Sequence, residues 1–387
     1  MAPAAGGRGF LRAAESAQAV LLGTVHGPTQ LDLHGWKADL AVERVVAAKA
    51  TPGSTLHVAW EELATARPPR LAEGDRVLVA LVPLPSGSLW MQRFPKRDAL
   101  ALGAGGQAFL RSPAPATLDL LQHYLALAPP ARERPEGVAL LAGLVEDGAA
   151  LMTDEALERL DEVPGLGEQL TPEAAAGLGR VVDDRGRPAE TRARLSALIG
   201  RRHLLALRPS LERATRPGSG IEAAAWDALA ELDGGLTPDA VRALVERPDP
   251  ALRRVAIDHA GRVLPEGRLA ALLRHDPAAE VRRAAVRALL AAFGDGALET
   301  VPPALFDPDP AVRTEAARGL GALGSKAVPT LRSLVEGREA RDATGPIAAL
   351  SLAGPDGQAA LRDIAEHSSD PAVRRLAEIA LGHLSEH

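Results

Sequence analysis

The 387-residue sequence contains no cysteine. Without thiols the chain cannot form a disulfide, use a thiolate nucleophile, or hold a cysteine-ligated zinc ion or an iron–sulfur cluster. Disulfide-stabilised folds and thiol-based redox chemistry are therefore excluded.

Aromatic residues and lysines are scarce. Aromatics make up 3% of the chain, so the core must consist mainly of Ala, Leu and Val, which suits closely packed helices. The formal net charge is −6, so the chain as a whole does not attract a polyanion. No apolar run is long enough to span a bilayer. The lysines are Lys37, Lys49, Lys96 and Lys326.

What the sequence does contain is a repeat. In the segment His275 to Leu290, Asp276 and Pro277 predict a helix start with Asp276 as its N-cap, and Ala, Val, Leu and Arg follow. Similar D-P-A-x-R segments begin at Asp249, Asp309 and Asp370. Their first arginines are separated by 282 − 253 = 29, 313 − 282 = 31 and 374 − 313 = 61 residues, the last step containing one degenerate copy. A period near thirty predicts a right-handed α-solenoid of stacked helical pairs over residues 137–387.

The N-terminal part has a different pattern. Residues 1–14 are rich in Gly, Ala and Pro, and we expect a mobile terminus. Short runs with alternating polar and apolar residues follow, and they predict a small antiparallel barrel of the OB-like type over residues 15–112. Residues 113–136 are predicted to be a linker and a first helix. The predicted strands are 18–26, 37–46, 54–60, 76–84 and 88–94.

Two resemblances follow from these motifs. Residues 23–25, 42–46, 52–58 and 71–81 resemble the netrin-like OB barrels of bacterial proteins. That resemblance implies an exported protein, periplasmic or secreted, that lacks its signal peptide here; otherwise we expect a cytoplasmic protein. The D-P-x-V-R-x-x-A pattern at Asp309 and Asp370, and its variant at Asp276, resembles HEAT repeats, specifically the HEAT-like repeats named for phycocyanobilin lyases.

The arginines and aspartates of the repeats recur in register with the stacking period. We therefore predict that they form a structural ladder, in which each guanidinium bridges neighbouring repeats and satisfies loop carbonyls. A phosphate-binding role for the same arginines is the alternative. The ladder residues are Asp249, Arg253, Asp276, Arg282, Asp309, Arg313, Asp370 and Arg374.

A second set of side chains is a candidate for binding a partner. These arginines fall on another face of the same helices, although glutamates accompany them and favour a mixed, solvated surface. Trp36 is added because an exposed tryptophan on a small barrel often anchors a partner. The candidate partner-binding residues are Trp36, Arg254, Arg283, Arg287, Arg318 and Arg375.

No motif for catalysis, cofactor binding or metal binding is present. The sequence has no P-loop, no G-x-S-x-G and no pair of histidines at metal-ligand spacing, so we expect no catalytic residue, cofactor or metal site. The solenoid predicts a non-enzymatic scaffold that binds a protein on its concave face, with the barrel as a second docking module. Nucleic-acid binding by barrel and solenoid groove is one alternative, disfavoured by charge. An enzyme with a site near His123 and Tyr124 is another.

Overall fold

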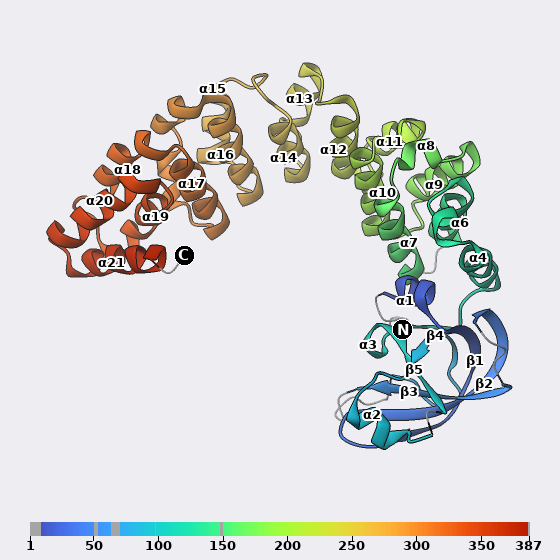
Figure 1. Ribbon diagram of the computed structural model, residues 1–387. Coiled ribbons are helices and arrows are strands. Elements are labelled where there is room, and N and C mark those ends of the chain that lie inside the picture. The colour runs from blue at the N-terminus through green and yellow to red at the C-terminus, as the bar shows by residue number, and fades with distance from the viewer. Residues whose placement is uncertain (1–8, 50–52, 63–69, 97, 148–149, 386–387) are drawn as a thin grey trace. The chain divides into compact units, whose positions relative to one another are not determined.

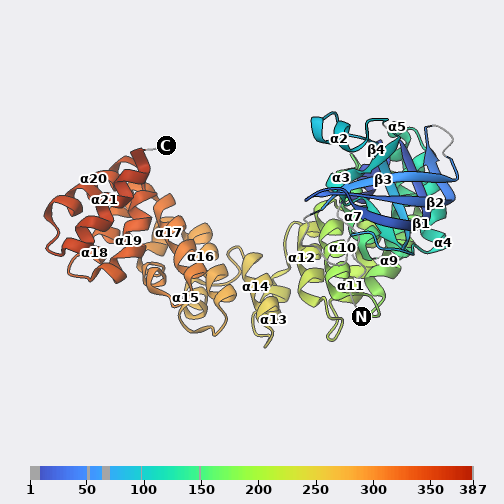
Figure 2. The ribbon, with the colours of Figure 1, turned by 90° about the horizontal axis from the view of Figure 1, so that it is seen from below.

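The computed structural model describes residues 9–49, 53–62, 70–96, 98–147 and 150–385. The chain divides into two compact units, Met1–Ala228 and Leu229–His387. Unit 1 therefore contains the barrel together with the first helical repeats, instead of ending where the predicted barrel ends. Each unit is described separately (Figures 1 and 2).

The strands of unit 1 form a closed barrel. Their order is β1-β2-β3-β5-β4, β4 also pairs with β1 to close the sheet, and β6 extends it beside β4. Neighbouring strands are antiparallel except β3 and β5, which run parallel, so the barrel is mixed and not purely antiparallel as expected. The strands are β1 (Ala19–Gln30), β2 (Gly35–Ala48), β3 (Thr55–Glu61), β4 (Arg76–Pro83), β5 (Ala99–Leu102) and β6 (Phe109–Arg111).

The barrel core is aliphatic with one large aromatic at its centre. Trp60 is 1% exposed and packs among the inward side chains of β1, β2 and β4. Its indole Nε1–H donates to Glu62 at 2.8 Å, which satisfies the polar atom of this buried ring. Alternating inward residues thus build the core as the alternation in the sequence predicts.

The predicted strand at 88–94 is wrong, because Ser88–Arg93 forms the helix α2. Trp90 and Arg93 are three residues apart, and the Arg93 guanidinium lies 5.0 Å from the centroid of the Trp90 ring, a contact that helical spacing allows. Trp90 also stacks with Phe94 against Ala59 of the barrel. This side-chain cluster selects the helix.

The N-terminal segment also differs from the prediction of a mobile end through residue 14. Residues 10–14 belong to the helix α1 (Phe10–Ser16), and Phe10 and Leu11 are fully buried. The prediction for residues 1–8 falls outside the described residues. A short helix of glycine-rich sequence, α3 (Gly103–Gly106), lies beside α1 and follows β5 directly.

The helices of unit 1 that follow the barrel stack in pairs. α4, α6, α9 and α11 pack in series, and α7 and α10 pack against them. Thr171 caps α9 by accepting from the N–H of Ala174, and Pro172 follows at the first helical position. The helices are α4 (Pro115–Ala126), α5 (Pro129–Arg132), α6 (Pro135–Asp147), α7 (Ala150–Glu162), α8 (Leu166–Gln169), α9 (Pro172–Asp183), α10 (Ala189–Arg201), η1 (Leu205–Leu207) and α11 (Arg208–Ala214). α12 (Glu222–Asp233) crosses the division between the units.

Unit 2 contains the repeats with the D-P-A-x-R pattern. α14, α16, α17, α19 and α21 pack in series and are called the inner layer, while the remaining helices cover their other side (Figure 1). The inner layer consists of α14 (Pro250–Asp258), α16 (Ala279–Phe293), α17 (Pro310–Ala322), α19 (Ala340–Ser351) and α21 (Pro371–Ser385). The other elements are α13 (Pro238–Leu244), α15 (Glu266–His275), η2 (Gly294–Glu299), η3 (Pro302–Phe306), η4 (Gly324–Lys326), α18 (Val328–Val335) and α20 (Gly354–His367). None of the helices in the described ranges is long and apolar enough to cross a membrane.

An ion pair fixes α2 to the β1–β2 hairpin. Arg93 is 8% exposed in its side chain and donates to both carboxylate oxygens of Asp32, at 2.5 and 2.7 Å. The hydrogen bond from Arg93 holds the pKa of Asp32 well below its ordinary value of 3.8. Ionised Asp32 therefore stabilises the fold above that ordinary value, and this stabilisation is lost as the pH falls toward the lowered pKa.

We expect Asp32→Asn to be less stable than the wild type at neutral pH, and the difference to shrink at about pH 3. The stability difference is measured by urea unfolding with tryptophan fluorescence as the signal. This signal reports unit 1, which contains all four tryptophans of the chain, Trp36, Trp60, Trp90 and Trp226. Glu133→Gln is the control, because Glu133 is an exposed carboxylate with no ion pair among the described residues. A difference that stays constant over this pH range would contradict the assignment.

Candidate functional site

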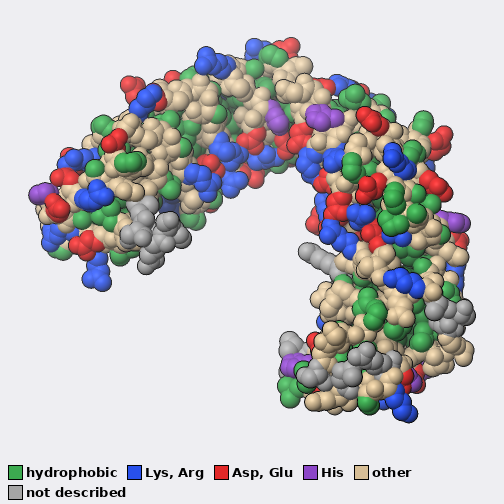
Figure 3. Space-filling view, in the orientation of Figure 1, with side chains coloured by type: hydrophobic (Ala, Val, Ile, Leu, Met, Phe, Trp, Pro, Cys, Tyr) green, Lys and Arg blue, Asp and Glu red, His purple; other side chains and the backbone are tan. Residues whose placement is uncertain are grey.

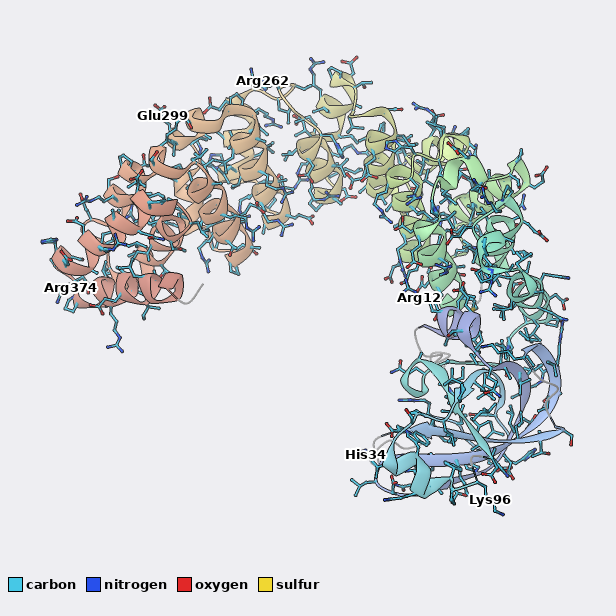
Figure 4. All side chains as sticks on the ribbon, in the orientation of Figure 1. Arg12, His34, Lys96, Arg262, Glu299 and Arg374 are labelled. Carbon is cyan, nitrogen blue, oxygen red and sulfur yellow. The ribbon has the colours of Figure 1, made fainter. Side chains whose placement is uncertain are left out.

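The predicted ladder arginines lie at equivalent places in unit 2. Arg253, Arg282 and Arg313 each occupy the first turn of an inner-layer helix, and Nη1 of each donates to two carbonyls of the loop before it. Those distances run from 2.7 to 3.2 Å. Arg374, labelled near the start of α21 in Figure 4, makes the corresponding bond to the carbonyl of Ser368 at 2.6 Å. These arginines therefore cap the ends of loops with a fixed geometry.

Two of the arginines also bridge to the next repeat. Arg253 donates through Nε and Nη2 to both oxygens of Asp276, at 2.8 and 2.9 Å. Arg282 makes the same bidentate pair with Asp307, both distances being 2.8 Å. Both carboxylates are nearly buried, with side chains 4% and 8% exposed. The ladder thus joins α14 to the segment before α16, and α16 to the segment before α17.

The pKa shifts agree with this geometry. The hydrogen bonds to Asp276 and Asp307 raise the pKa values of Arg253 and Arg282. Burial raises the pKa of Asp307, but the hydrogen bond from Arg282 and the N–H of Asp309 outweigh burial, so the net shift is downward. The Arg282–Asp307 pair therefore stays charged at neutral pH.

The aspartates divide into two kinds, which the sequence analysis treated as one. Asp249 and Asp309 are N-caps of α14 and α17, with the side chain accepting backbone N–H groups. Asp370 likewise accepts from the N–H of Ala372 at 2.8 Å. Asp276 was expected to be an N-cap, but the N-cap of α16 is Ala278, and Asp276 pairs with Arg253 instead.

The physical reason is the register relative to the arginine. Asp276 precedes Arg282 by six residues, whereas Asp249 precedes Arg253 by four. The six-residue position places a carboxylate next to the guanidinium of the preceding repeat. Asp307 occupies this position and was missed, although the doubled D-P-D-P at 307–310 is a visible signal for it.

The second row of arginines lies on the inner layer and is paired with acids. Arg254 pairs with Asp258 at 2.7 Å, and Arg287 bridges from Asp258 at 2.7 Å to Glu315 at 3.4 Å. Arg283 approaches Glu315 at 3.9 Å. Acidic and basic side chains gather on the inner side of unit 2 near α14 and α16 (Figure 3). The row is therefore a continuous mixed-charge network across α14, α16 and α17.

Two of the predicted partner-binding arginines extend beyond this network. Arg318 and Arg375 are exposed, on α17 and α21. Among the described residues neither has an ion pair. They leave cationic groups available on the inner layer.

Trp36 is not an exposed anchor. It is half-buried and stacks on Trp60, with ring centroids 6.1 Å apart and an angle of 15° between the planes. Its Nε1–H is buried and has no acceptor among the described residues. The most exposed large apolar side chains of the described barrel are instead Leu33, which is 70% exposed, and Leu89, which is 57% exposed, followed by Val45 at 40%.

The other aromatic side chains of the barrel core are buried too. Trp60, Trp90 and Phe94 are at most 9% exposed. A surface that binds single-stranded nucleic acid presents aromatic faces on which bases stack. The described aromatics of the barrel do not provide such a platform.

The region around Tyr124 was the site considered for an enzyme. The Tyr124 hydroxyl donates to Glu15 of α1 at 2.6 Å, and Arg159 donates to the same oxygen at 3.1 Å. Tyr124 is fully buried, and burial raises the pKa of its hydroxyl. His123 is exposed. The two side chains therefore do not share an environment.

A pocket lies in the barrel part of unit 1. Its volume is about 230 Å³, and it lies between α1, α3 and α2. Trp60, Trp90 and Leu102 form apolar walls, while Ser16 and Glu61 are its polar lining. The scattered histidines do not gather there: His26 pairs with Glu73 and His57 with Asp39. In the part of the chain that the structure describes, no three metal-ligating side chains form a cluster.

Comparison with protein-family models matches residues 265–351 to HEAT repeats. The match covers α15 to α19 and so includes Arg282 and Arg313 of the ladder. Together with the stacked pairs it shows that the barrel is followed by a HEAT-like α-solenoid. The closer resemblances, to netrin-like domains and to the repeats of phycocyanobilin lyases, stay predictions. Comparison with curated protein sequences gives no match.

Several solved structures are similar in part, among them the following three. Human deoxyhypusine hydroxylase is 19% identical over 65% of this chain and 97% of its own, with a TM-score of 0.31. YibA of Escherichia coli is 17% identical over 70% and 98%, with a TM-score of 0.40. The CpcE–CpcF complex of phycocyanin lyase from Nostoc is 16% identical over 64% and 94%, with a TM-score of 0.35. These values are too low to transfer an activity or a partner to this chain.

Proposed function

We propose that the chain is a non-enzymatic scaffold and that the inner layer of unit 2 binds a partner protein whose surface carries acidic and basic side chains complementary to a mixed-charge row. The observation that carries this proposal is the row of charged side chains across α14, α16 and α17. In that row Arg254, Arg283 and Arg287 pair with the carboxylates of Asp258 and Glu315. Arg318, exposed on α17, adds a cation that has no ion pair among the described residues.

The pairing within the row favours a protein over a nucleic acid. Arg287 is held between two carboxylates, so its side chain is positioned before a partner arrives, which lowers the entropic cost of binding. A phosphate backbone would have to approach those same carboxylates, whose negative charges oppose it. A protein surface offers both signs of charge and can match the row.

The barrel is proposed as the second docking module. Leu33 lies at the turn between β1 and β2, and Leu89 lies in α2, which Arg93 ties to that turn through Asp32. Two exposed leucines on adjoining segments provide apolar contact area for a partner. The binding of protein through the inner layer does not depend on this second contact.

The test uses charge reversal on the inner layer. We expect the double variant Arg283→Glu and Arg318→Glu to lose the proteins that the wild-type chain captures from lysate, because the row then carries excess negative charge. The matched control is Arg242→Glu with Arg262→Glu, which changes the net charge equally. Both arginines are exposed, and Arg262 extends from the loop between α14 and α15 (Figure 4).

The measurement is a pull-down with each variant, with and without nuclease, after circular dichroism has shown that the variants are folded. Capture that survives nuclease and disappears only in the inner-layer variant supports the proposal. Capture that both variants retain would place the contact elsewhere, and capture that nuclease abolishes would favour nucleic acid.

A further inference from the structure

The ladder is interrupted after its second bridge. Arg313 donates through Nη1 to the carbonyls of Asp307 and Pro308 at 2.7 and 2.9 Å, as Arg253 and Arg282 do with their own loops. In those two arginines Nε and Nη2 hold a carboxylate of the next repeat. No described residue accepts a hydrogen bond from Nε or Nη2 of Arg313. One edge of this half-buried guanidinium is therefore vacant.

The sequence explains the vacancy. Each ladder arginine follows a fully buried apolar residue, and Ala343 is the corresponding residue of the degenerate repeat. The ladder carboxylate precedes that residue by five positions, since 281 − 276 = 5 and 312 − 307 = 5. The same count gives 343 − 338 = 5, so Arg338 stands where the earlier repeats have aspartate. A cation has replaced the anion that Arg313 would bind.

Arg338 lies at the same loop as Arg313. Its guanidinium is 4.4 Å from the centroid of the Phe306 ring, and the next residue, Asp307, gives its carbonyl to Arg313. Two guanidinium groups therefore contact consecutive residues. The nearby acids are engaged by other arginines: Glu336 pairs with Arg332 and Glu339 with Arg341. The same loop also contains Asp307 and Asp309, but Asp307 pairs with Arg282 and Asp309 caps the start of α17, so neither carboxylate takes up Nε or Nη2 of Arg313.

We propose that Arg313 and Arg338 form a binding site for the carboxylate of an aspartate or glutamate side chain of a partner protein. The planar carboxylate would take the place of the missing ladder aspartate, with two parallel bonds from Nε and Nη2 of Arg313. Arg338 is exposed and adds a second cation from the solvent side. The bridges at Arg253 and Arg282 show that the fold holds this guanidinium edge in the geometry that a carboxylate requires. The site lies between the first turn of α17 and the loop before α19, and it does not rest on the proposed role of the mixed-charge row.

The test uses a fluorescein-labelled hexaglutamate peptide and fluorescence anisotropy with the full chain. Arg338→Asp restores the missing aspartate, which should occupy Arg313 itself. We expect this variant to bind the peptide at least about tenfold more weakly than the wild type and to melt at a higher temperature. Arg262→Asp is the matched control with the same change of charge, and its affinity should stay within about twofold.

Two further variants separate the loss of one cation from the filling of the Arg313 edge, and this site from the inner layer. Arg338→Gln should weaken binding less than Arg338→Asp, because it removes one cation but leaves Arg313 vacant, and it serves if the aspartate variant does not fold. Arg318→Glu, on the inner layer, should leave the anisotropy titration nearly unchanged, so loss in that variant alone would locate the peptide on the inner layer and overturn this site.

Competition with inorganic phosphate at matched ionic strength tests whether the site binds a protein carboxylate or a free oxyanion. We expect phosphate to compete weakly with the peptide. Phosphate that binds the wild type as tightly as the peptide, and not the Arg338→Asp variant, would assign the site to a free oxyanion and overturn the protein-carboxylate proposal. Equal peptide binding by the wild type and Arg338→Asp would overturn the site altogether.

Discussion

Replacing Glu155 by alanine is expected to lower the free energy of unfolding by about 3–5 kcal/mol. Glu155 lies on α7 and is 6% exposed, and its carboxylate accepts the N–H groups of Gly9, Phe10 and Leu11 at 2.7, 2.8 and 2.5 Å. Alanine leaves three donors at the start of α1 without an acceptor in a buried place. The decrease in the free energy of unfolding is measured by urea unfolding with tryptophan fluorescence as the signal.

The control is Glu158→Ala on the same helix. The Glu158 side chain is 64% exposed and pairs with Arg194 at 3.4 Å, so its removal should cost less than about 1 kcal/mol. Glu155→Gln should fall between the two, because one amide oxygen still accepts hydrogen bonds. Equal stability of Glu155→Ala and Glu158→Ala would show that α1 does not depend on this carboxylate.

The solenoid could be predicted because its information is local. Each D-P-A-x-R segment contains its own helix start, buried apolar face and arginine within about ten residues. The helix α16 (Ala279–Phe293) forms where the repeat predicts a helix, although its N-cap is Ala278 and not Asp276. The strands β1 to β4 were found for the same reason, since alternation along one strand already shows which face is buried.

The two wrong predictions of secondary structure concern segments that are held by residues far away in the sequence. The helix α2 was taken for a strand, and it is held by Asp32, which is sixty-one residues away from Arg93. The helix α1 was taken for a mobile end, although Glu155 fixes it from a distance of about 145 residues in sequence. No local sequence pattern in α1 or α2 indicates the distant residue that holds it. The glycine-rich composition near residue 10 therefore outweighed the apolar pair Phe10 and Leu11 in the prediction.

In the candidate site, the repeat aspartates were predicted in the wrong register relative to the arginines. The ladder arginines were found because they recur with the period, but the aspartates were aligned on the D-P dipeptide. The alignment joined Asp276 with Asp249 although their distances from the arginine differ by two residues. The same misalignment hid Asp307 and concealed that Arg338 replaces a carboxylate. Aligning on the buried residue before the arginine would have separated the two kinds.

Because Asp276 and Asp249 lie at different distances from the ladder arginine, replacing each by alanine is expected to lower the stability by different amounts. We expect Asp276→Ala to lower the stability of unit 2 by about 3–5 kcal/mol, because it leaves the guanidinium of Arg253, 12% exposed in its side chain, without its counter-charge. Asp249→Ala removes an N-cap at the surface and should cost about 1 kcal/mol. Far-UV circular dichroism in urea follows the helices of both units, while tryptophan fluorescence reports unit 1 alone.

Loss confined to unit 2 should therefore appear as an earlier transition in the dichroism signal with the fluorescence transition unmoved. A double-mutant cycle with Arg253→Met separates the pair from the other bonds of Asp276, which also accepts the N–H of Ala278 at 2.9 Å. Because methionine removes the buried charge, the double variant should be more stable than Asp276→Ala alone. If Asp276→Ala and Asp249→Ala cost the same, the two aspartates are equivalent caps and the ladder does not hold the repeats together.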